Sequence, residues 1–115
     1  MSEPFRLFFR DIELGMIVEN YADFPNLWGT FKMVDTIGEG ELWHRLQDFI
    51  AQSIVGHGLM EDDKMNEWEQ FENELGERFP DLIETEDWHL LIDDKRVLIM
   101  VPIFERNNGI VWRWN

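Results

Sequence analysis

The chain has 115 residues, which is enough for one hydrophobic core and too short for two ordinary domains, so we expect a single domain over residues 1–115. Hydrophobic residues make up 44% of the chain and aromatic residues 14%, which excludes disorder of the whole chain. Twenty-four acidic and 10 basic residues give a net charge of −14. That charge argues against direct binding to nucleic acid or to an anionic membrane, because both depend on Lys and Arg.

Cysteine is absent, which excludes disulfides, thiolate-bound zinc and iron–sulfur clusters and is typical of a reducing compartment. Arg6 and Arg10 interrupt the apolar residues near the start, so we expect no signal-peptide core there. The longest nearly apolar run, residues 97–104, is too short to span a bilayer. These observations together predict a cytoplasmic protein.

The first third of the chain predicts three strands. Residues 5–11 alternate with a period of two, and residues 14–19 follow after a short gap, which is typical of a hairpin. Residues 20–26 are rich in turn-forming types and predict a loop. Residues 28–34 alternate again and predict the third strand.

The middle of the chain predicts two amphipathic helices. Thr36 and Glu39 have the spacing of a capping box, and Gly56 and Gly58 are natural stops, so the first helix is expected between them. A second helix is expected from about residue 62 to residue 79, since Pro80 ends it. The first helix carries apolar residues at helical spacing: Leu42, Leu46, Phe49, Ile50 and Ile54.

The last third predicts three more strands. Residues 88–92 form the first, and residues 97–105 form the second, which is apolar on both faces and is therefore expected at the centre of the sheet. Pro102 has no N–H to donate and implies a bulge or a free side. Asn108 and Gly109 predict a tight turn before a last strand at 110–114. The order βββααβββ predicts an α+β fold, with two helices on one face of a six-stranded, mostly antiparallel sheet.

The acidic residues are concentrated in one part of the chain. Residues 61–87 contain twelve acids and two bases, a net charge of −10, and most of this segment belongs to the predicted second helix. Such a helix face is either simply solvated or a docking surface for a basic partner, with Glu67, Glu69 and Glu74 at its centre. A mimic of nucleic-acid phosphates is a third reading.

Two groups of aromatic residues suggest recognition surfaces. Trp112 and Trp114 share one face of the last strand, which is either covered by the helices or exposed to a partner. Tyr21 and Phe24 lie in the predicted loop before Trp28, which is either a packed turn or the rim of a pocket.

Candidate residues for chemistry are few. Ser53 lacks the Gly-x-Ser-x-Gly context of a hydrolase nucleophile, and no HExxH, EF-hand or phosphate-loop motif is present, so no catalytic residue is predicted. His44 and Asp48 share a helix face at i,i+4 spacing, and His57 follows near the end of that helix. These three are a candidate metal site, and a surface hydrogen bond between the first two is the simpler alternative. We expect His89 to be a partly exposed strand residue.

The composition favours a non-enzymatic interaction protein that binds a basic macromolecule through the acidic second helix and exposed aromatic residues. Small inhibitor and immunity-type proteins share this compact, acidic profile, a likeness of composition alone. The alternative is a small-ligand or metal-binding protein with a site between helices and sheet. No organic cofactor is expected, and a homodimer through the last strand is compatible with either reading.

Overall fold

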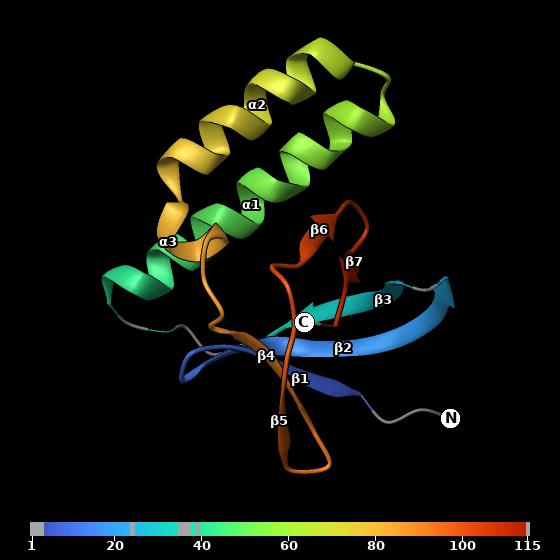
Figure 1. Ribbon diagram of the computed structural model, residues 1–115, viewed down its shortest axis with the longest axis vertical. Helices are drawn as coiled ribbons and strands as arrows, with labels where there is room; N and C mark the ends of the chain where they lie inside the picture. Colours follow the sequence, from blue (N-terminus) through green and yellow to red (C-terminus); the bar gives the residue numbers. More distant parts are fainter. Residues whose placement is uncertain (1–3, 24, 35–37, 39, 115) are drawn as a thin grey trace.

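The computed structural model describes residues 4–23, 25–34, 38 and 40–114 of the chain, which form an α+β fold with one antiparallel sheet (Figure 1). The predicted class is thus confirmed, but the described residues form seven strands in place of the six expected, and three helices in place of two. The strands are β1 (Phe5–Phe9), β2 (Ile12–Asp23), β3 (Asn26–Met33), β4 (Trp88–Ile92), β5 (Lys95–Leu98), β6 (Ile103–Glu105) and β7 (Gly109–Trp112). The helices are α1 (Glu41–Glu61), α2 (Met65–Arg78) and α3 (Pro80–Ile83).

The sheet is rolled so that its two ends meet. The strand order is β5-β4-β1-β2-β3-β7-β6, which places β5 and β6 at opposite ends although only residues 99–102 separate them in the chain. The backbone N–H of Ile99 donates to the carbonyl of Trp88 in β4, and Ile99 also bridges to Trp114 just beyond β7. Ile99 therefore joins both ends, and the sheet closes around a core.

The segment 97–105, predicted as one strand, contributes a strand to each end of this sheet. The structure divides it into β5, which pairs with β4, and β6, which pairs with β7. The prediction of one continuous strand was therefore wrong. Pro102 lies in the break, as its missing N–H predicts. The expected central position was also wrong, because β5 and β6 are the first and last strands of the order. Ile99 is buried at the closure, whereas Leu98, Met100 and Ile103 are exposed, so apolar residues on both faces did not indicate burial of both faces.

The prediction that Gly56 and Gly58 end the first helix was wrong, since α1 continues through both to Glu61. Gly56 instead permits a close approach of α2: a Cβ placed there would lie only 2.7 Å from the ring of Phe71. The helix ends where Asp63 adopts a left-handed backbone conformation with φ of 60°.

The predicted loop at 20–26 was also wrong, because β2 extends to Asp23 and β3 begins at Asn26. The side chain of Tyr21 stacks on Trp28 across these strands, with 4.8 Å between the ring centroids. Phe24 lies outside the described residues, as do Thr36 and Glu39 of the predicted capping box.

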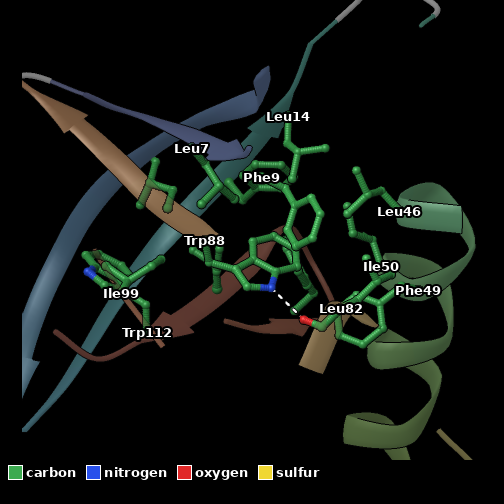
Figure 2. Packing of buried hydrophobic residues seen from close by; sticks show 14 of the residues in the cluster. Leu7, Phe9, Leu14, Leu46, Phe49, Ile50, Leu82, Trp88, Ile99 and Trp112 are labelled. Carbon is green, nitrogen blue, oxygen red and sulfur yellow. Dashed lines mark hydrogen bonds between the residues drawn. The ribbon is translucent and has the colours of Figure 1, made fainter. Parts of the chain in front are cut away.

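The core lies between the rolled sheet and α1, with Trp88 at its centre (Figure 2). Trp88 contacts Phe9 edge to face at 5.0 Å, and its indole N–H donates to the carbonyl of Leu82 at 2.7 Å. Figure 2 shows Leu46, Phe49 and Ile50 of α1 on the same side of this cluster. Helix α1 thus covers the sheet.

Helix α2 packs along α1 and has only one buried residue, Leu75. Its other side chains therefore face α1, the cavity described below, or solvent. No helix in the described ranges is long and apolar enough to cross a membrane.

Candidate functional site

A partly enclosed cavity of about 210 Å³ lies among the three helices and the segment 101–103 that enters β6; we call it the helix cavity. Its apolar lining residues are Phe49, Met60, Trp68, Leu75, Ile83, Val101, Pro102 and Ile103. Its polar lining residues are Ser53, His57 and Glu72. An apolar concavity with a few polar groups is the usual form of a small-molecule site.

Helical spacing brings the polar groups of α1 into this cavity. Ser53 and His57 are four residues apart and therefore share one face of α1. The Ser53 hydroxyl oxygen accepts a hydrogen bond from the backbone N–H of Phe104 at 3.3 Å, which leaves its own proton free to donate to a ligand.

Glu72 enters the cavity wall from α2. The residue as a whole is exposed, but neighbouring side chains desolvate its carboxylate, and this desolvation raises its pKa. The nearby His57 acts in the opposite direction. A carboxylate with restricted hydration is a strong acceptor for a donor on a bound molecule, because water competes less for it.

His57 is held between two carboxylates. Its Nδ1 lies 2.8 Å from an oxygen of Glu61, one turn along α1, and its Nε2 lies 3.4 Å from an oxygen of Glu105 in β6. The His57 side chain is 14% exposed and that of Glu105 is 21% exposed. The ring is therefore fixed between the helix and the sheet.

The structure does not bring together the predicted metal site of His44, Asp48 and His57. His44 and His57 are thirteen residues apart on α1, or about 20 Å along its axis. Asp48 forms an ion pair with Arg78 of α2 at 3.1 Å, and His44 is exposed. The partners of His57 are Glu61 and Glu105 instead. The i,i+4 spacing of His57 and Glu61 was visible in the sequence, whereas the approach of Glu105 depends on the long-range pairing of β6.

The three predicted acidic residues of α2 lie on two flanks of the helix, Glu67 and Glu74 on one and Glu69 on the other, because residues seven apart share a flank and residues two apart do not. Glu67, Glu69 and Glu74 are all exposed, and none of them forms an ion pair with another residue in the described part of the chain. We call these three residues the acidic surface.

The predicted aromatic surface residues are divided between core and surface. Trp112 is 1% exposed and lies in the core, so it offers nothing to a partner. Trp114 is 37% exposed, and Tyr21 is 57% exposed where it stacks on Trp28. Trp112 and Trp114 thus do not form a joint exposed surface. His89, expected to be partly exposed, is buried at 7% and stacks on Phe8.

The last strand, β7, is paired on both sides. Residues 109–112 pair with β3 and residues 109–111 pair with β6. A homodimer formed by adding a strand at β7, which the sequence permitted, would therefore find residues 109–111 already paired on both sides.

Comparisons of the chain with models of known protein families, with curated protein sequences and with solved structures gave no match.

Proposed function

We propose that the chain is a binding protein that holds a small, mainly apolar molecule in the helix cavity. The observation that carries this proposal is the cavity itself, with its apolar lining interrupted by Ser53, His57 and Glu72. An engineered apolar cavity of about 150 Å³ binds benzene, so about 210 Å³ accommodates a ring with a short polar substituent. The three polar groups then orient the polar end of the ligand.

The test is an NMR screen of the labelled protein with small aromatic and aliphatic amines, alcohols and carboxylates of roughly six to ten non-hydrogen atoms. We expect binders to shift the methyl resonances of Met60, Leu75 and Ile83. Met60→Trp should fill the cavity and abolish these shifts. Val55→Trp is the matched control, because Val55 is an exposed apolar residue of α1 that does not line the cavity. The proposal fails if no compound shifts the cavity methyls, or if both variants lose binding equally.

A second candidate function is docking of a basic macromolecule on the acidic surface. It is supported by the exposure of Glu67, Glu69 and Glu74 and by the net charge of −10 within residues 61–87. Unpaired charge of one sign attracts a partner of opposite sign and accelerates association. This candidate no longer includes Trp112. The expected compartment, by cysteine usage, is the cytoplasm.

The acidic surface is tested with a tagged pull-down from the source organism's nuclease-treated lysate at low and high salt. Reversal of Glu67, Glu69 and Glu74 to Lys should remove a basic partner that binds only at low salt. A control variant with the same charge change, at the exposed residues Asp11, Asp23 and Glu86, should retain it. Equal loss in both variants would indicate attraction by net charge and would reject a defined docking surface.

A further inference from the structure

We propose that His57 and Glu105 hold a divalent transition-metal ion at the edge of the helix cavity. The two ring nitrogens of His57 face two different carboxylates. Such a metal site goes beyond the binding of a small molecule in the cavity.

The hydrogen bond to Glu61 determines which nitrogen is free. The Nδ1 of His57 lies 2.8 Å from Oε1 of Glu61, and an ionised carboxylate can only accept, so Nδ1 donates its proton there. In the neutral ring the proton is thus on Nδ1, and the lone pair is on Nε2. Histidine residues that bind metals usually donate their second N–H to a carboxylate in this way, which fixes the tautomer and orients the ring.

The spacing on the other side of the ring suits an ion better than a hydrogen bond. The Nε2 of His57 lies 3.4 Å from Oε2 of Glu105, beyond the usual range of about 2.7–3.2 Å for N–H···O bonds. Two ligand atoms bound to one tetrahedral ion at about 2.0–2.2 Å lie about 3.3–3.6 Å apart. Without a cation or a second proton, the lone pairs of Nε2 and Glu105 would face each other.

The surrounding charge favours a cation. Within the described part of the chain, neither Glu61 nor Glu105 forms an ion pair with Lys or Arg. Arg106 is the nearby base, but its guanidinium makes two contacts to Asp62, at 3.0 and 3.3 Å. Glu72 adds a further carboxylate near His57. This negative surplus beside a ring that is 14% exposed attracts a cation to the site.

The ligand types indicate the class of metal. One imidazole nitrogen and one carboxylate oxygen suit Zn²⁺, Mn²⁺ or Fe²⁺, and the absence of Cys ligands argues against Cu⁺. Because His57 also lines the helix cavity, the ion would lie at the edge of that space. A polar group of a bound molecule or water would then complete the coordination.

The test is a calorimetric titration of the untagged, chelator-treated protein with Zn²⁺ and Mn²⁺ in the absence of any small ligand. We expect one site for at least one of these ions, with affinity at least tenfold weaker in His57→Gln and in Glu105→Gln. Glu61→Gln should weaken binding by about 10- to 100-fold, as expected for loss of the carboxylate that orients the ring. The variants His44→Gln and Asp48→Asn should bind as the wild type does, since this exposed i,i+4 pair is on the same helix.

A second measurement keeps the inference testable if a variant fails to fold. In the wild type, ¹⁵N NMR of the His57 ring should show a Zn²⁺-dependent shift of Nε2 while Nδ1 stays protonated. A doubly protonated ring at neutral pH that Zn²⁺ does not affect would overturn the proposal, because His57 would then bridge the two carboxylates as an imidazolium. Unchanged Zn²⁺ affinity in His57→Gln would also overturn it. Neither result bears on ligand binding in the cavity, which the NMR screen measures separately.

Discussion

Two buried tryptophans in this core differ in one hydrogen bond. Trp88 is fully buried and donates its indole N–H to Leu82, whereas Trp112 is 1% exposed and its buried N–H has no acceptor among the described residues. A buried donor without a partner costs about 1–3 kcal/mol. The two side chains are therefore similar in size and burial, but only the indole N–H of Trp88 has a hydrogen-bond acceptor among the described residues.

Replacement of each tryptophan by Phe separates these effects. Both variants lose similar indole volume, but only Trp88→Phe breaks a hydrogen bond and leaves the carbonyl of Leu82 unpaired. We expect Trp88→Phe to reduce the free energy of unfolding by about 1 kcal/mol more than Trp112→Phe does. Urea denaturation measures both values. Equal losses would contradict the assignment of the unpaired donor to Trp112.

His89 makes the stability of the protein depend on pH. Burial lowers the pKa of its imidazole, which is 7% exposed and stacks on Phe8 at 5.2 Å. In the unfolded chain His89 takes up a proton near pH 6.5, whereas in the folded chain it does so only at lower pH. As pH falls through about 6.5 the unfolded state binds more protons, so the free energy of unfolding decreases.

We expect the free energy of unfolding to fall as the pH is lowered from 7 to 5.5. The slope of this free energy against pH should be smaller in His89→Gln, by an amount that corresponds to at most one bound proton. Denaturant titrations at a series of pH values give this slope. His44→Gln is the control, because His44 is exposed on α1. If His44→Gln reduces the slope as much as His89→Gln does, burial of His89 is not its source.

Among the elements, the contact between α1 and α2 depends on Gly56, which the sequence pattern indicated as the end of a helix but which lies inside α1. Gly56 is buried in α1 with Phe71 against it, whereas Gly76 in α2 is exposed and would have no atom within 4 Å of an added Cβ. Both glycines are helical, and helix propensity alone predicts that Ala stabilises each by up to about 1 kcal/mol. The packing reverses this expectation at Gly56.

We therefore expect substitutions of opposite sign. Gly76→Ala should raise the free energy of unfolding by about 0.5–1 kcal/mol, because it restricts the unfolded chain and meets no obstacle. Gly56→Ala should lower it by about 1–3 kcal/mol, since the Phe71 ring must move. Stabilisation by Gly56→Ala would show that α2 does not pack closely on α1 at this position.

Local patterns predicted most elements but not how they join. The period-two alternation found β1 and β3, and the apolar stripe found both long helices. The turn-rich residues 20–26 were misleading because cross-strand pairing, seen in the stack of Tyr21 on Trp28, overrides local preference. The split of 97–105 between two strands could not be predicted, since it follows from closure of the sheet and not from the segment itself.

The candidate site was predictable only in part. His57 was identified as a candidate ligand. Its predicted grouping with His44 and Asp48 was possible only if the first helix ended before His57, and α1 continues to Glu61. No sequence pattern indicated Glu105 as a site residue, because its position near His57 depends on the pairing of β6 with β7. Contacts of this kind depend on tertiary structure, and one sequence contains no periodic signal for them.

At the scale of the whole molecule, net charge opposes folding. The chain carries −14, and the acidic surface has no ion pairs in the described ranges to offset its repulsion. Added salt screens repulsion between exposed charges, with a Debye length near 10 Å at 0.1 M. Stability should therefore rise with ionic strength.

We expect the Tm to increase by a few degrees between about 0.02 M and 0.5 M NaCl. A variant with Glu67, Glu69 and Glu74 changed to Gln should have a higher Tm at low salt and a smaller gain from salt. The same three changes at Asp11, Asp23 and Glu86, to the corresponding amides, provide the control for net charge. A Tm that falls with added NaCl would show that ion pairs such as Arg45 with Asp81 outweigh the repulsion.

Closure of the sheet at Ile99 has a consequence for aggregation. An open sheet presents unpaired backbone at both edges, and such edges recruit strands from other chains. Here Ile99 and Met100 join the two ends, and only β5 projects beyond this closure (Figure 1). Its free edge is four residues long and begins with the exposed Lys95 and Arg96. Short, charged edge strands resist pairing with other chains. The protein can therefore carry exposed apolar strand residues such as Met16 and Val18 without offering a long edge on which fibrils could grow.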